Sequence, residues 1–190
     1  MIPPSHRDRL VLIPIRAGSK LPEVPEGRSW KEPCFRLTPN QALKRLKAGR
    51  NVGVAGTRDS LVILDIERGN IPEADRHLPP PLKDTLIVRT RSGGLHLYYL
   101  NAGVPNQDLV IGGRRLVEVR SDWRYVLAPG SYVPPDGEGD GLYRVVNRKP
   151  PLALSPSLLP WLSELKRPAE RGPVEFRGRH LSLPCVAKLL

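Results

Sequence analysis

The chain has 190 residues, 39% of them hydrophobic and 26% charged, which suits one globular domain with a short appendage. Its formal net charge of +11 favours a polyanionic partner, nucleic acid first and an anionic membrane surface second, although a solvated basic surface stays open as the simpler explanation. Two cysteines without CxxC spacing exclude a disulfide framework and a zinc knuckle, and no apolar run suits a signal segment or a membrane span, so we expect a cytosolic protein.

The first predicted elements are a strand at residues 10–15 and a helix between Thr38 and Gly49. The strand is the apolar run LVLIPI. The helix carries its own end signals, because Thr38 suits the N-cap, Pro39 suits the first helical position and Gln41 completes a capping box. Gly49 is the glycine that commonly ends a helix.

Most of the remaining predicted elements are strands, recognised as β-branched or aromatic runs between Gly, Asn or Pro. In chain order we expect a strand or turn at 51–56, a strand at 61–67, a short helix at 71–78, strands at 85–90, 95–100, 115–120 and 125–130, and a helix at 155–165. The sequence RSGG between two of these strands predicts a hairpin. The fold class is therefore α+β with a substantial, partly antiparallel sheet.

The end of the chain differs in composition from the rest. Residues 166–181 are polar and charged and are expected to form a linker, because they cannot bury much surface. Residues 182–190 resemble the start of a helix that is cut off, so we expect the natural chain to continue into a helical domain. Residues 1–165 are then the main domain, whose stability should depend little on the tail.

Two carboxylates end an otherwise apolar strand. In the stretch LVILDIE, Asp65 and Glu67 share a face with Leu61 and Ile63, and the other face is wholly apolar. A strand that is apolar on both faces is normally central and buried, which argues against the alternative of an exposed edge strand. Burying two acids costs on the order of several kcal/mol unless a partner pairs with them.

A second strand supplies a third carboxylate. In RLVEVR, Glu118 and Arg120 share a face, so Asp65, Glu67 and Glu118 could all point into one cleft. Three converging carboxylates would repel one another unless a divalent cation held them ionised. Hard oxygen ligands favour Mg²⁺ or Mn²⁺, and such acids can straddle two ions about 3.5–4 Å apart.

The segment RTRSGGLHLYY suits phosphate binding. Arg89 and Arg91 share a strand face, and the two glycines permit a close backbone approach. An arginine fork matches phosphate oxygens, and the N–H groups of the Ser-Gly-Gly turn can add donors. A lone histidine is more often structural than functional, but this one lies beside a predicted metal cleft. We therefore expect the following residues to contact a triphosphate: Arg91, Ser92, Gly93, Gly94 and His96.

The ordered trio LVILDIE, RTRSGGLHLYY and LVEVRSDWRYVLAPGS resembles the three motifs of the archaeo-eukaryotic primase superfamily. It is most similar to the bifunctional primase–polymerase (prim-pol) domain of plasmid and viral replication proteins, over roughly residues 10–165. The resemblance implies an RRM-like catalytic sheet with flanking helices, joined to a smaller N-terminal α/β part. It also implies primer synthesis and extension by two-metal nucleotidyl transfer, in which one metal activates the primer 3′-hydroxyl and the other binds the triphosphate.

The resemblance carries roles onto individual residues. It implies that Asp65 and Glu67 are metal ligands, that His96 contacts the phosphates of the incoming nucleotide, and that Glu118 is the third acid. Many members of the superfamily have Asp where this chain has Glu118. The resemblance further implies that Arg120 touches phosphate. The expected partners are single-stranded or primed DNA, ribo- or deoxynucleoside triphosphates and, in the full-length protein, a helicase domain.

Three other functions remain open from the residues. A two-metal nuclease would usually need a lysine base where the chain has Arg120. A nicking replication initiator could use Tyr98 or Tyr99 as its nucleophile, but it would want a second histidine at position 98. A non-catalytic nucleic-acid-binding module would have no need of the three acids.

Overall fold

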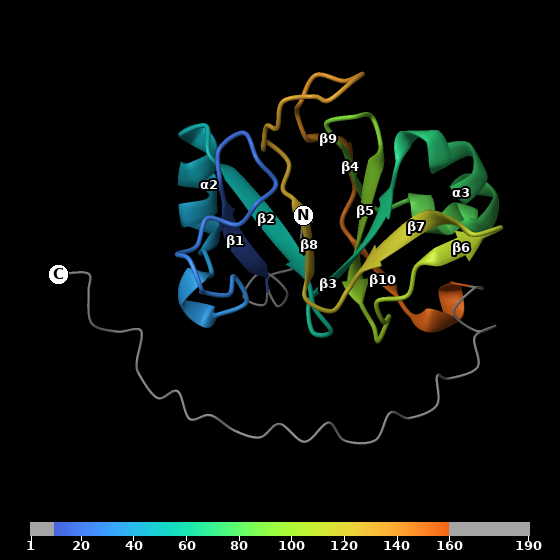
Figure 1. Cartoon of the computed structure of the whole chain (residues 1–190). Helices are drawn as coiled ribbons and strands as arrows, with labels where there is room; N and C mark the ends of the chain where they lie inside the picture. Colours follow the sequence, from blue (N-terminus) through green and yellow to red (C-terminus); the bar gives the residue numbers. More distant parts are fainter. Residues whose placement is uncertain (1–9, 160–190) are drawn as a thin grey trace.

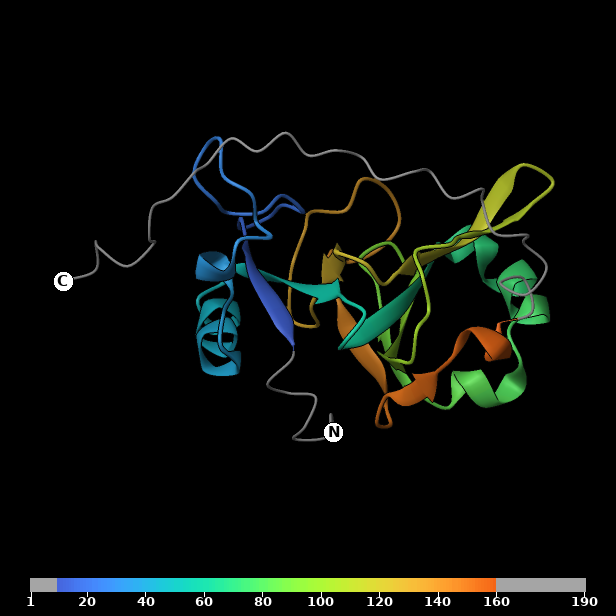
Figure 2. The ribbon, with the colours of Figure 1, turned by 90° about the horizontal axis from the view of Figure 1, so that it is seen from below.

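The computed structural model describes residues 10–159, which form two β-sheets and two α-helices in successive layers. Figure 1 shows the order of these layers as helix α2, a small sheet, a large sheet and helix α3, and Figure 2 shows the two helices again at opposite ends. The fold class is therefore mixed α+β, as the sequence predicts. Within the described residues, neither α-helix has the length and apolarity of a membrane span.

The small sheet consists of β1 (Val11–Ile15), β2 (Asn51–Gly56) and β8 (Arg124–Leu127), with β2 in the centre. Helix α2 (Pro39–Lys47) packs against β1 and β2. The predicted capping box is confirmed, because Gln41 N donates to Thr38 Oγ1 at 3.3 Å and Thr38 N donates to Gln41 Oε1 at 2.8 Å. The small sheet is not wholly N-terminal, since β8 joins it from the second half of the chain.

The large sheet has the strand order β6-β7-β3-β5-β4-β9, and β10 pairs with the C-terminal end of β5. Its strands are β3 (Leu61–Ile66), β4 (Leu86–Arg89), β5 (Leu95–Asn101), β6 (Leu109–Ile111), β7 (Arg114–Arg120), β9 (Arg144–Arg148) and β10 (Leu152–Leu154). Every pairing is antiparallel except that of β10 with β5. Helix α3 (Ile71–His77) follows β3.

The two faces of β3 belong to two different hydrophobic clusters. Leu61 and Ile63 pack between the sheets, with side chains from β1, β2 and β8. Val62 and Leu64 pack on the outer face, in a cluster that includes Ala74 of α3. This central, doubly buried position is the one predicted for the strand. It places Asp65 on the side of the large sheet that faces the small sheet.

Three short strands were not predicted from the sequence. They are β6, β9 and β10, each with two or more exposed or half-buried residues. The hairpin that joins β6 to β7 has Gly112 and Gly113 in its turn, both with positive φ, which is a recognisable hairpin signal. Of the helix predicted at 155–165, the described residues contain only the 3₁₀ turn Pro156–Leu158. The rest of that helix, the linker at 166–181 and the segment at 182–190 lie outside the described residues.

Candidate active site

A cleft of about 460 Å³ is lined by residues of both sheets. The large sheet supplies one wall, which includes Asp65, His96 and Glu118. The small sheet supplies Tyr125 and Leu127 from β8. Residues predicted from three separate motifs thus line a single cleft.

The sheet register brings two of the predicted carboxylates together. Asp65 on β3 lies directly opposite Glu118 on β7, so the two side chains stand on the same face. Both are largely buried, with side-chain exposures of 20% and 15%. Glu67 follows just after β3, is exposed, and lines the same cleft. Unlike the other two, Glu67 has no ion pair with any residue that the structure describes.

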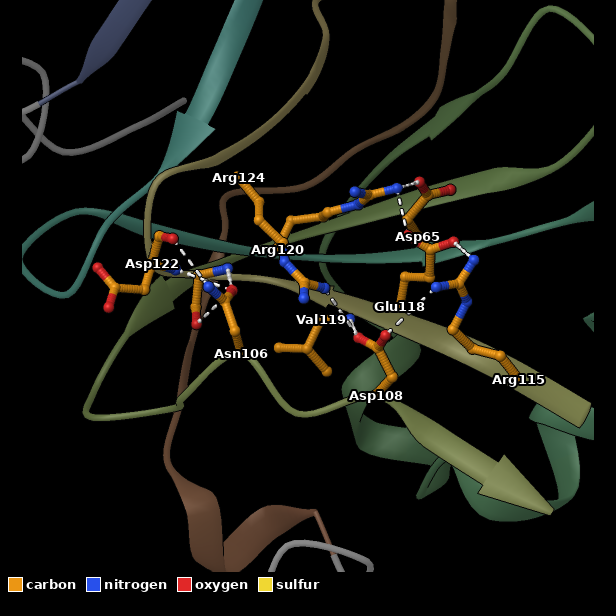
Figure 3. A network of polar contacts seen from close by, with 10 residues as sticks. Asp65, Asn106, Asp108, Arg115, Glu118, Val119, Arg120, Asp122 and Arg124 are labelled. Carbon is orange, nitrogen blue, oxygen red and sulfur yellow. Dashed lines mark hydrogen bonds and ion pairs between the residues drawn. The ribbon is translucent and has the colours of Figure 1, made fainter. Parts of the chain in front are cut away.

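Two arginines neutralise the buried carboxylates (Figure 3). Arg120 Nη2 lies 3.1 Å from Asp65 Oδ2 and also pairs with Glu118. Arg115 Nη2 lies 2.5 Å from Glu118 Oε1. Burial on its own raises the pKa of Asp65, but the hydrogen bond and charge of His96, together with Arg120, hold it below its usual value. Asp65 is therefore ionised at neutral pH.

His96 lines the cleft but is almost fully buried beside Asp65. It lies directly opposite Asp65 on β5, with Nε2 3.5 Å from Asp65 Oδ1 and only 4% exposure. The rings of Tyr98 and Tyr143 pack beside it, with centroids 6.4 and 5.8 Å away. Its Nδ1 atom is buried and has no hydrogen-bond partner within the part of the chain that the structure describes.

The predicted Ser-Gly-Gly turn joins β4 to β5 and packs against the end of β3. Thr90 N donates to Gly94 O at 2.9 Å and closes the hairpin loop. Gly93 adopts φ +86°, a conformation that hairpin loops commonly place at a glycine. A Cβ atom on Gly94 would lie 2.5 Å from the carbonyl oxygen of Ile66. The glycine therefore lets the turn approach the backbone that carries the acids.

Arg91 lines the cleft, but its guanidinium is occupied by a neighbouring loop. Its Nη1 donates to Pro134 O at 2.5 Å, and its Nη2 lies 2.6 Å from Asp136 Oδ2. The Arg91 side chain is only 10% exposed. A phosphate in the cleft would have to share this arginine with Asp136.

A model of the bifunctional DNA primase/polymerase N-terminal domain, Prim-Pol, matches residues 6–160. The chain belongs to this family. A search of curated proteins finds no match. Prim-Pol domains are DNA primase/polymerases and hence nucleotidyltransferases, whose activity implies a DNA template and nucleotide substrates.

The carboxylates of the Prim-Pol cleft are of the kind that bind a divalent ion, but they are not arranged as a preformed metal site. Among residues 10–159, no group of three or more His, Cys, Asp or Glu side chains is arranged to hold a metal ion. The guanidinium of Arg120 pairs with both Asp65 and Glu118. The donor set still fits Mg²⁺ or Mn²⁺, because Asp65, Glu67 and Glu118 present hard oxygens to one cleft. The metal site stays a prediction.

Sequence reasoning missed several residues that shape this Prim-Pol site. Asp108 lies beside β6, accepts a hydrogen bond from Val119 N at 2.9 Å, and pairs with Arg115 and Arg124 (Figure 3). Asn106 accepts from Ser121 N and so fixes the connection after β7. Neither residue carries a sequence signal, because their partners lie on other segments of the chain. Lys20, Arg68, Asp136 and Tyr143 also line the cleft without having been predicted.

The two tyrosines considered as nicking nucleophiles are both buried. Tyr98 and Tyr99 are 2% and 0% exposed, and Tyr99 donates its hydroxyl hydrogen to Leu82 O at 2.6 Å. Burial raises the pKa of both phenols, which disfavours the phenolate. The geometry gives no support to a tyrosine nucleophile.

Proposed function

We propose that the cleft carries out template-directed nucleotidyl transfer, with Asp65, Glu67 and Glu118 as ligands for two divalent cations. The observation that carries the proposal is that these three carboxylates line one cleft together with His96 and the turn after Arg91. Family membership supplies the reaction type. The proposal includes an RRM-like role for the large sheet, and the resemblance points to plasmid or viral replication.

The chain's own residues divide into two groups in this proposal. Mg²⁺ or Mn²⁺ bound to the carboxylates would activate the primer 3′-hydroxyl and stabilise the leaving pyrophosphate. The groups that would hold the triphosphate are Arg91, Ser92, Gly93, Gly94, His96 and Arg120. Support comes from their position, because the turn and His96 adjoin the carboxylates through β5 and β3.

Arg120 has a specific part in preparing the cleft. In the described structure it donates to Asp65 and Glu118 and keeps their negative charges from repelling each other. Its guanidinium matches phosphate oxygens equally well, so it can donate to a substrate when the carboxylates have another cationic partner.

Primer extension tests the proposal. The protein is supplied with a primed or an unprimed single strand, ribo- or deoxynucleotides separately, and Mg²⁺, Mn²⁺ or EDTA. We expect elongated products that depend on the template, on the divalent ion and on nucleoside triphosphates. Strand cleavage in place of elongation would instead identify a nuclease, and strand binding without any product would identify a binding module.

A further inference from the structure

A second basic pocket adjoins the catalytic cleft. It has a volume of about 520 Å³ and is lined by four arginines: Arg68, Arg89, Arg91 and Arg144. Arg68 and Arg91 also line the cleft, so the two hollows adjoin each other. Asp140 is the one acid among the described lining residues of this arginine pocket, and it pairs with Arg144.

The sheet register places two of these arginines in an unfavourable position. Arg89 on β4 lies directly opposite Arg144 on the edge strand β9. Like charges directly opposite each other on neighbouring strands destabilise the strand pair. Arg89 has no ion pair with any described residue and is exposed. Of this strand pair, Arg144 is compensated by Asp140, whereas the charge of Arg89 has no partner among the described residues.

An acidic loop forms one ion pair with each of the other three arginines of the pocket. The loop is PPDGEGDG, residues 134–141, and its three acids alternate with glycines. Asp136 pairs with Arg91, Glu138 with Arg68 and Asp140 with Arg144. All three acid side chains are more than half exposed, so solvent and salt screen their ion pairs and the pairs contribute little to stability. Phosphate oxygens can therefore replace these carboxylates.

One glycine holds the acidic loop against the backbone of the phosphate-binding turn. Gly139 adopts φ +130°, and a Cβ atom there would lie 2.0 Å from the carbonyl oxygen of Arg91. At Gly137 an added Cβ would meet nothing within 4 Å. The loop is thus docked tightly at one glycine and loosely at the other.

We propose that the arginine pocket is a second phosphate-binding site, which takes the backbone of a DNA strand as it passes the cleft. In the free protein the acidic loop occupies these arginines in place of phosphate, and the strand displaces it. The identification of the polyanion as DNA rests on the proposed function, whereas the phosphate-binding site itself is argued from the arginine pocket. A strand is favoured over a free nucleoside triphosphate, because the proposed triphosphate site is the adjoining cleft with the carboxylates, and Arg89 and Arg144 lie outside that cleft.

Strand binding in EDTA, without nucleotide, tests the site independently of catalysis. The probe is a fluorescent oligothymidylate, and the readout is anisotropy across a salt series. We expect Arg144→Gln to weaken binding about threefold or more, by the loss of one charge-assisted contact, and to reduce the salt slope by about 0.7. Arg148→Gln is the matched control, because Arg148 lies at the other end of the same strand and outside the pocket. Equal weakening by both variants would overturn the proposal.

Two glycine variants, which leave the charge of the protein unchanged, test whether the acidic loop competes with the strand. Gly139→Ala should dislodge the loop and tighten strand binding about threefold, because the ion pairs that compete with the strand are lost. Gly137→Ala should leave the affinity unchanged. The variant D136N/E138Q/D140N should tighten binding more than D59N/E73Q/D75N, which gains the same charge elsewhere. If Gly139→Ala binds no more tightly than Gly137→Ala, or the two neutralised variants bind alike, the loop does not compete with the strand.

A third comparison separates the two sources of phosphate. With Arg144→Gln, we expect the KM for nucleotide in primer extension to stay within twofold of wild type while strand affinity falls. A raised KM with unchanged strand affinity would assign the pocket to the nucleotide and overturn the proposal. Loss of extension by the wild-type protein would count against the proposed function alone, since strand binding is measured without catalysis.

Discussion

Individual side chains explain how acids can be buried at the end of an apolar strand. Asp65 has two partners on the strands beside it, Arg120 and His96, and Arg120 also pairs with Glu118. The alternation of side chains along a strand was enough to predict that Asp65 and Glu118 share a cleft. It could not predict that Arg120 would pair with both, because that contact depends on the register of β3 against β7.

The pKa of Asp65 gives a pH-dependent prediction. A carboxyl whose folded-state pKa lies below its unfolded value stabilises the fold above the unfolded pKa, and that stability is lost as pH falls through the folded pKa. For Asp65 the usual value is 3.8 and the folded value is lower. The difference in Tm between wild type and Asp65→Asn should therefore shrink as the pH falls from 5 to about 3. Asp59→Asn, at an exposed loop position, is the control. A constant difference would show that the pairing of Asp65 contributes no pH-dependent stability.

Removing the first two acids should abolish primer extension without unfolding the protein. In the variant D65A/E67A, Arg120 keeps Glu118 as its partner, so no buried charge is left unpaired. We expect the rate of extension to fall by at least about 100-fold, the loss typical of one preorganised electrostatic group. Circular dichroism and the Tm report the fold, and E73Q/D75N on α3 is the control. Extension at more than a tenth of the wild-type rate would remove these acids from the proposed metal site.

His96 is tested by separating nucleotide binding from strand binding. If His96 contacts the triphosphate, His96→Ala should raise the KM for nucleotide more than it weakens the binding of an oligonucleotide. Its 4% exposure and its packing against Tyr98 and Tyr143 support a second, structural part for this residue. Equal loss of both kinds of binding, with a lower Tm, would assign His96 to the structure alone.

At the scale of elements, local patterns predicted the strands that carry the motifs, whereas long-range pairing determined the rest. β3, β5 and β7 have strong apolar or alternating patterns, and α2 has complete end signals. The short strands β9 and β10 exist because they pair with β4 and β5, so their own sequences carry little signal. The docking of the 134–141 loop on Arg91 was likewise beyond local reasoning.

One close contact between elements gives a stability prediction. Gly56 ends β2, and a Cβ atom there would lie 2.0 Å from the carbonyl oxygen of Arg120 at the end of β7. Gly56→Ala should therefore destabilise the protein by about 1–3 kcal/mol, because backbone of one sheet must move away from the other. It should also slow primer extension, since Arg120 moves with its backbone. Chemical denaturation measures the first effect, and Gly137→Ala is the control. An unchanged free energy of unfolding would mean that the sheets separate easily at this contact.

At the scale of the whole molecule, the net positive charge and the position of the cleft favour binding of DNA through its phosphates. The net charge is +11, and the cleft lies between the sheets beside a pocket lined by arginines. The layered arrangement could not be predicted from the sequence, because it depends on β8 leaving β7 to pair with β2. Composition alone did predict an anionic partner, and family membership gives DNA as the template.

Binding of a single strand should therefore be strongly dependent on salt. We expect the logarithm of the affinity to fall linearly with the logarithm of salt concentration, with a slope of about −0.7 for each phosphate neutralised. Four arginines in contact with phosphate would give a slope of about −3. Titrations of oligothymidylate at several concentrations of sodium chloride measure the slope. A slope near zero would mean that the strand is held without phosphate contacts.

The position of β8 also has a consequence for the order in which the protein can fold during synthesis. β1 and β2 are complete once residue 56 has left the ribosome, but their sheet lacks its third strand until residues 124–127 follow. Until then the edge of β2 at Gly53–Gly56 has unpaired backbone groups, which invite pairing with other chains. A nascent chain stalled between these points should aggregate more readily than one stalled after residue 127, so a chaperone would have most to protect in that interval.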